Sequence, residues 1–173
     1  MFVNGIFLLS IVTFVVHLLL TRSKGLGALR VIELLLLHLL AVFWGIGGLA
    51  VAIPHIVWPD VAANYLQWPT GNPFQLYAGF AMNGIAIVGV LCIWHRGWFW
   101  LAPLAMRAVF LTGAAYIHIS GGIYAHRLTR EFAMQVLFYD IFLPLAAIIL
   151  FAAYVTLGGT RNDAVSAPGN SHS

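Results

Sequence analysis

The chain has 173 residues, of which 62% are hydrophobic and only 8% are charged. Soluble domains are roughly 45–50% apolar and about 25% charged, so this chain cannot cover a surface that faces water. The net charge of +3 comes from basic residues too scattered to track phosphates, which excludes nucleic acid as a partner. The single cysteine, Cys92, excludes an internal disulfide and a cysteine-rich zinc site. We therefore expect an integral membrane protein whose main partner is the lipid bilayer.

Five apolar stretches are each long enough to cross a bilayer as a helix, which takes about 20 residues. In chain order they are residues 5–20, 31–53, 74–94, 98–119 and 133–157. The first has no basic segment before it and no cleavage site after it, so we expect it to stay as a helix. Pro54 is expected to end the second helix. The sequence thus predicts an all-α bundle of five transmembrane helices, in one domain of residues 1–157, in the inner cell membrane.

Lysine and arginine in the short loops predict the orientation, because they gather on the cytoplasmic side. With the N-terminus outside, the cytoplasmic loops contain Arg22, Lys24, Arg30, Arg96 and Arg161, and the outer loops contain only Arg127 and Arg130. The count favours an N-out, C-in arrangement. The polar tail, residues 158–173, is then expected to be cytoplasmic and disordered.

Residues 54–73 connect the second and third stretches and contain four prolines. Proline restricts the residue before it, so this loop is expected to hold one shape. Trp58, Tyr65 and Trp68 have the amphipathic rings that settle at the level of lipid headgroups. We interpret them as an interfacial belt that anchors a short amphipathic segment from Pro59 to Leu66.

Polar side chains inside the apolar stretches are expected to face the bundle interior, because an unpaired charge in hydrocarbon is costly. This interior set is Glu33, His38, Asn83 and Arg107. Arg107 lies near the middle of the fourth helix, too far from either interface to reach water. We expect it to contact Asn83, a backbone carbonyl near Pro103, or Asp140.

A second polar set lies at the outer ends of the helices in the N-out arrangement and predicts a pocket that opens outward. Its members are His55, Asp60, Gln75, Tyr77, His118 and Asp140. We expect His118 and Asp140 to be neighbours below the loop of residues 54–73. Their role is open between a structural pair and a binding site.

Two cofactor classes suit the outer pocket, a divalent metal and a quinone headgroup. Imidazole and carboxylate together bind divalent metals, and the candidate ligands are His55, Asp60, His118 and Asp140. Their spacing matches no metal motif, which favours a structural role. Haem is disfavoured because it needs axial histidines at matched depth and only His38 lies deep. The sequence contains no nucleophile motif, so we assign no catalytic residues. The sequence alone does not decide whether the protein is an enzyme.

Several short motifs carry a resemblance to a known family. They are the run from His55 through Pro59-Asp60, then Trp68-Pro69-Thr70-Gly71-Asn72-Pro73-Phe74-Gln75, then Gly79-Phe80-Ala81, Gly113-Ala114-Ala115 with His118, and Tyr139-Asp140-Ile141. Together they resemble a family of small prokaryotic integral membrane proteins that is classed as a domain of unknown function. The helix layout is also distantly similar to the DoxX-type four-helix proteins, membrane subunits linked to quinone or thiol redox systems. The resemblance supports the predicted topology and the choice of candidate residues, and it implies no established activity.

Two classes of function fit these observations. The leading hypothesis is an accessory subunit, or a small-molecule-binding component, of a membrane assembly formed with other membrane subunits or as a homo-oligomer. Its basis is the small size and the lack of a catalytic motif. The alternative is a membrane oxidoreductase-like protein, or a metal-binding or quinone-binding protein, that uses the outer His/Asp pocket.

Overall fold

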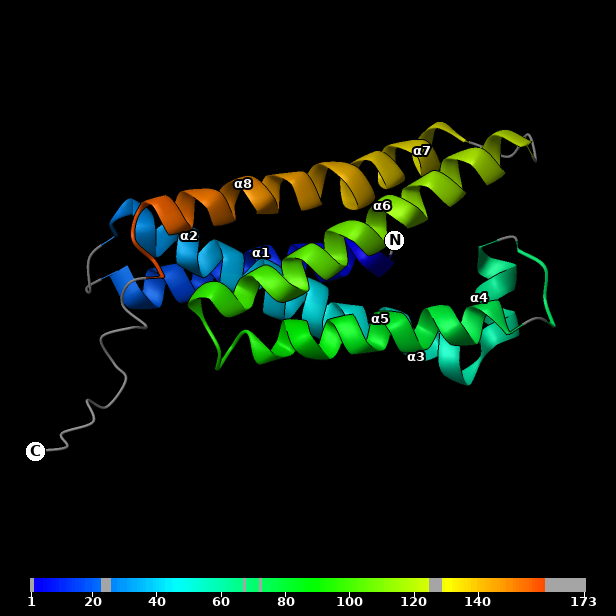
Figure 1. Ribbon diagram of the computed structural model, residues 1–173, viewed down its shortest axis with the longest axis horizontal. Coiled ribbons are helices and arrows are strands. Elements are labelled where there is room, and N and C mark those ends of the chain that lie inside the picture. Colours follow the sequence, from blue (N-terminus) through cyan, green and yellow to red (C-terminus); the bar gives the residue numbers. More distant parts are fainter. Residues whose placement is uncertain (1, 23–25, 67, 72, 125–128, 161–173) are drawn as a thin grey trace, which may run out of the picture.

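The structure of the protein is a computed structural model that describes residues 2–22, 26–66, 68–71, 73–124 and 129–160, all of them in helices or short connections (Figure 1). Five helices in this described part are long and apolar enough to cross a membrane: Phe2–Thr21, Ala28–Val57, Phe74–Leu91, Gly97–Gly121 and Arg130–Thr156. The prediction of an all-α chain with five such helices is confirmed, and it is compatible with a membrane protein. The tail from residue 161 onward lies outside the described residues, as do Lys24 and Arg127.

The first span, α1 (Phe2–Thr21), lies on the outside of the bundle, with Ser10 as its buried residue. The Ser10 hydroxyl donates a hydrogen bond to the His38 carbonyl at 3.0 Å and so ties α1 to the second span. Large apolar side chains such as Leu8 and Leu20 are more than half exposed. An apolar helix with so little burial fits a lipid-facing position.

The second span is the central helix of the bundle and consists of α2 (Ala28–Leu37), the π-helical segment η2 (His38–Ile46) and α3 (Gly47–Val57). The prediction that it ends at Pro54 is wrong, because Pro54 lies inside α3 and the helix continues to Val57. It ends instead before Pro59, since the preceding residue, Trp58, has the non-helical φ of −132°. A residue before proline is disfavoured in the helical region, which explains this end point.

The loop after α3 contains the short helix α4 (Pro59–Tyr65), at the place where an amphipathic segment was predicted. Pro59 stands at its first helical position, where the missing N–H costs nothing. Trp58 and Tyr65 are exposed, as members of an interfacial belt would be. Trp68 differs from them, because it is half-buried and its ring stacks on His118.

The third span, α5 (Phe74–Leu91), packs very closely against η2. A Cβ atom on Gly89 would lie 2.8 Å from the Leu40 carbonyl oxygen, and one on Gly45 would lie 2.8 Å from the Val90 nitrogen. Only glycine at both positions lets the two backbones approach this far. Gly45 and Gly89 therefore set the close spacing of these two spans.

The last two spans complete the bundle. The fourth consists of the 3₁₀ turn η3 (Gly97–Trp100) and α6 (Leu101–Tyr124). The fifth consists of α7 (Arg130–Val136), the π-helical η4 (Leu137–Phe142) and α8 (Leu143–Thr156). Figure 1 shows α2 and the end of α8 at one end of the molecule and α4 at the other.

The hydrophobic core fills the end of the bundle where α2 and α8 meet. Leu36, Leu40, Trp100 and Ala147 are fully buried there, together with Leu104, which is 1% exposed. Trp100 stacks on Tyr154, and its indole N–H donates to the Cys92 carbonyl at 3.2 Å. The half of the bundle nearer α4 contains a cavity.

Candidate functional site

A cavity of about 650 Å³ lies in the half of the bundle nearer α4, among side chains from α1, η2, α3, α5, α6 and η4. We call it the outer pocket after the pocket predicted from the sequence, because four of the six predicted residues line it and only Asp60 and Gln75 do not. Most of its lining is apolar and includes Phe43, Met82 and Phe110. Tyr77 and Val109 also line it and are 74% and 76% exposed, so the cavity reaches the surface at α5 and α6. Its titratable lining residues are His55, Tyr77, Arg107, His118, Tyr139 and Asp140.

Arg107 is the most deeply buried charged residue of this lining, with 4% of its surface exposed. Its Nη2 donates a hydrogen bond of 2.6 Å to the carbonyl oxygen of Trp44 in η2. The prediction that Arg107 faces the bundle interior and contacts an acceptor there is confirmed, but the acceptor is none of the three that the sequence suggested. The Nε of Arg107 is buried without a hydrogen-bond partner in the described part of the chain. A guanidinium has five N–H donors, so this contact leaves most of them unused.

Gly48 makes the room that Arg107 occupies. A Cβ atom on Gly48 would lie 2.7 Å from Arg107 Nη2 and 3.0 Å from the Ala86 Cβ. Both distances are shorter than ordinary van der Waals contact, so a larger residue would push the guanidinium away from the Trp44 carbonyl. The position of the Arg107 guanidinium thus depends on the small size of Gly48 in α3 and on the Trp44 carbonyl in η2.

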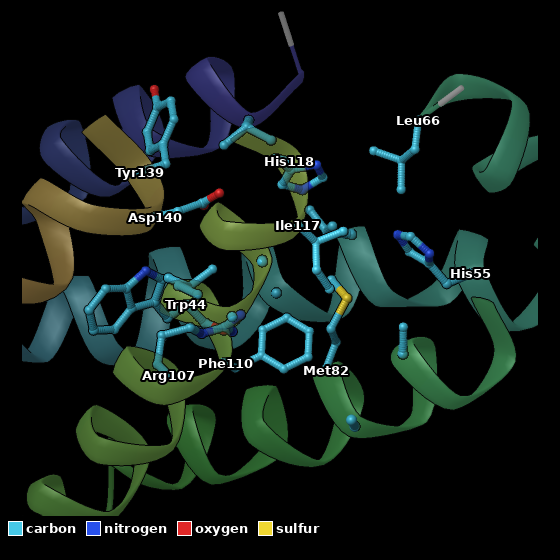
Figure 2. A pocket seen from close by; sticks show the side chains of 18 of the residues that line it. Trp44, His55, Leu66, Met82, Arg107, Phe110, Ile117, His118, Tyr139 and Asp140 are labelled. Carbon is cyan, nitrogen blue, oxygen red and sulfur yellow. The ribbon is translucent and has the colours of Figure 1, made fainter. Parts of the chain in front are cut away.

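Asp140 lies in η4 on another wall of the outer pocket and is half-buried. Within the described residues it makes no direct hydrogen bond or ion pair, although the charge of Arg107 acts on it electrostatically. Figure 2 shows Arg107, Asp140 and His118 around the same space. The pocket therefore holds two opposite charges that do not neutralise each other by contact.

His118 lies on α6 and is held by aromatic rings. Its imidazole stacks on Trp68 with ring centroids 5.6 Å apart, and it makes a T-shaped contact with Phe132 with ring centroids 5.4 Å apart. Because Trp68 belongs to the loop after α4, this contact places that loop over the pocket, where Leu66 and Trp68 both line the cavity. His118 and Asp140 share the pocket, but the described residues contain no direct hydrogen bond between them.

His55 and Gln75 form a pair between α3 and α5. The Nδ1–H of His55 donates to Oε1 of Gln75 at 2.6 Å, and Gln75 is 2% exposed. An amide oxygen can only accept, so the bond fixes the tautomer and leaves His55 Nε2 without the proton if the ring is neutral. Gly79 permits this approach, since a Cβ atom there would lie 2.9 Å from the His55 Cβ.

Three of the four predicted metal ligands, His55, His118 and Asp140, line the outer pocket, and Asp60 does not. Asp60 lies outside the lining of the outer pocket, and its Oδ1 accepts a hydrogen bond from the Gly71 N–H at 2.9 Å. Asp60 stands in the first turn of α4, where the returning loop supplies this donor. Among the described residues, no three His, Cys, Asp or Glu side chains are close enough to hold a metal ion.

Three members of the predicted interior set lie away from the outer pocket or make no contact with it. Glu33 accepts from Arg30 at 2.8 Å and from Arg96 at 2.5 Å, at the end of the bundle opposite α4. His38 is 7% exposed and donates from Nδ1 to the Leu34 carbonyl at 2.9 Å. Asn83 is half-buried on α5 and is not part of the pocket lining.

Comparison with known proteins supports one assignment. Residues 1–159 match the model of a family of unknown function, DUF6790. The chain belongs to this family. No curated protein and no solved structure matches the chain. The match confirms that the chain belongs to a family of unknown function; the motifs read as that family's signature and the resemblance to DoxX-type proteins stay expectations.

Proposed function

We propose that this protein is a multi-pass protein of the inner cell membrane that binds a small molecule in its outer pocket and acts as a component of a larger membrane assembly. The observation that carries the proposal is the cavity of about 650 Å³ among membrane-spanning helices, with Arg107 and Asp140 on its walls. Ligand sites are typically cavities of about 300–1,000 Å³, mostly apolar, with a few polar groups that orient the ligand. The outer pocket has this size and this composition.

The burial of Arg107 also supports a binding role. A charged side chain inside a membrane protein normally pairs with another charge or faces a site that it serves. Arg107 contacts a backbone carbonyl and not the carboxylate of Asp140 across the same pocket. A pair that served stability alone would gain from direct contact, since a buried charge without its partner is costly. The separated charges are therefore better explained by a ligand between them.

The orientation that we propose is N-out and C-in. It places the outer pocket and α4 on the outer side, and the cluster of Glu33 with Arg30 and Arg96 on the cytoplasmic side. Arginine gathered at that end agrees with the positive-inside rule. The exposed apolar surface of α1 offers a face for lipid or for another membrane subunit.

The test is the amount of small molecule that copurifies with the full chain. The protein is purified in mild detergent, extracted with solvent and analysed by mass spectrometry. A matched pair of variants supplies the control: Gly113→Phe projects into the outer pocket, whereas Gly84→Phe on α5 does not line it. At both glycines an added Cβ would meet nothing within 4 Å, so neither substitution clashes at that atom.

We expect one class of compound to copurify with the wild type and with Gly84→Phe in near-stoichiometric amount. Gly113→Phe should retain about tenfold less, which corresponds to about 1.4 kcal/mol of binding free energy. Equal retention by all three proteins would show that the bound material lies elsewhere. That result would contradict the proposed function.

A further inference from the structure

The described lining residues of the outer pocket include one arginine, Arg107, and one acidic residue, Asp140, which carry opposite charges when both are ionised. Its formal charge is therefore zero when the histidines are neutral. An anionic ligand would meet the carboxylate of Asp140, and a cationic ligand would meet the guanidinium of Arg107. A ligand with a single net charge would be attracted by one of these side chains and repelled by the other, so together the two side chains favour neither sign of net charge.

The two charged groups also present hydrogen-bonding capacity of opposite kinds. Arg107 can only donate, and its one hydrogen bond to Trp44 leaves further N–H groups unused. An ionised Asp140 can only accept, and within the described residues it receives no hydrogen bond. A headgroup that accepts from Arg107 and donates to Asp140 would satisfy both side chains at once.

The rest of the pocket suits an alkyl chain. Phe43, Met82 and Phe110 line it, and Figure 2 shows Met82 and Phe110 beside the space below His118. The cavity reaches the surface at Tyr77 and Val109, on the two helices α5 and α6. Because α5 and α6 are spanning helices in the proposed function, we take this opening as the place where a ligand enters sideways from the bilayer.

We infer that the ligand is a neutral long-chain amphiphile whose headgroup carries both a hydrogen-bond acceptor and a hydrogen-bond donor, as a carboxamide or a hydroxyl-bearing ester does. Its acceptor lies on Arg107 and its donor on Asp140. This inference rests on the proposed function and adds the chemical class of the ligand. It requires no bond to be made or broken.

The experiment compares four compounds with the same eighteen-carbon chain and different headgroups. They are oleamide, which accepts and donates; methyl oleate, which only accepts; oleate, an anion; and oleylamine, a cation. Each is tritium-labelled and bound to the full chain in nanodiscs, with a scintillation proximity readout and with Gly113→Phe as the blank. We expect oleamide to bind best, and each of the other three to bind about tenfold more weakly or worse.

Two substitutions test the assigned contacts. Asp140→Asn removes the negative charge and keeps the shape, so oleate should gain about tenfold while oleamide changes little. Arg107→Gln removes the positive charge, so oleylamine should gain and oleamide should lose about tenfold. These are opposite changes in headgroup preference, which a purely structural role of either residue would not produce. Size-exclusion profiles establish that each variant is folded, and either variant alone is sufficient for the test.

Tighter binding of oleate or of oleylamine to the wild type would overturn the inference and leave the proposed function standing. Equal binding of all four compounds, or equal binding of oleamide and methyl oleate, would also overturn it, because the headgroup would then not be recognised as we describe. Binding of none of the four above the Gly113→Phe blank would reject this ligand class. The proposed function would then be judged separately by the copurification experiment.

Discussion

Gly48→Ala should destabilise the protein, because the methyl group would take the space of the Arg107 guanidinium. The added Cβ would lie 2.7 Å from Nη2 and 3.0 Å from the Ala86 Cβ. The end of an arginine side chain can move, but here movement breaks the 2.6 Å hydrogen bond to the Trp44 carbonyl in a buried site. Ala86 belongs to the closely packed α5 and cannot yield as easily.

The size of this effect follows from three terms. Loss of a hydrogen bond from a charged donor costs about 1.5–3 kcal/mol, and overpacking adds about 1–3 kcal/mol. Alanine is a better helix former than glycine by about 1 kcal/mol, which offsets part of the loss. We therefore expect a net destabilisation of about 1.5–5 kcal/mol, relative to the wild type.

The assay is unfolding in mixed detergent micelles, and Gly84→Ala is the matched control. Gly84 also lies in a spanning helix, but a Cβ atom there would meet nothing within 4 Å. The control should be as stable as the wild type or more stable by up to about 1 kcal/mol. If Gly48→Ala were as stable as Gly84→Ala, Arg107 would not be held against Gly48 and Trp44 as described.

Three further predictions concern the rest of the molecule. Reporter fusions after Ala62, Arg96 and Gly159 should read outside, inside and inside, and an outside signal at Gly159 would contradict the N-out orientation. Glu33→Gln should lower the free energy of unfolding by only about 1 kcal/mol, because the two ion pairs with Arg30 and Arg96 are partly exposed. A larger loss of stability than that of Gly48→Ala would contradict this and would mean that this end of the bundle dominates stability. Cys92, which is fully buried, should react with a maleimide only after unfolding, and fast labelling of the folded protein would disagree with its place in the core.

The five spanning helices could be predicted from hydropathy, because each is long and apolar enough to be recognised alone. Their ends were harder to predict, since helix formation extends past the apolar window. The second span begins at Ala28, before the charged residues Arg30 and Glu33 that dilute its hydropathy. It also passes through Pro54, and it ends where Trp58 is restricted by Pro59.

The contacts of the outer pocket could be predicted only in part. The cost of exposing a charge to lipid predicted that Arg107 lies in the interior. Its partner could not be predicted, because it is a backbone carbonyl and every residue has one. The π-helical segments η2 and η4 carry Trp44 and Asp140, and their sequences contain no signal that separates them from ordinary helix. The stacking of His118 on Trp68 joins residues 50 positions apart, so it depends on the path of the loop after α4.

The central claim is that the outer pocket takes a small molecule from the membrane, and photolabelling of the full chain in nanodiscs tests it most directly. A diazirine placed in the alkyl chain of a long-chain carboxamide is activated by light, and the labelled residues are mapped by mass spectrometry. We predict labelling of Met82 on α5 and Phe110 on α6, lost in Gly113→Phe and kept in Gly84→Phe. The part of α1 from Leu8 to Leu20 serves as the reference for contact with bulk lipid, because its apolar side chains are exposed and do not line the outer pocket. Labelling of this part of α1 equal to that of Met82 and Phe110, unchanged by Gly113→Phe, would contradict the account.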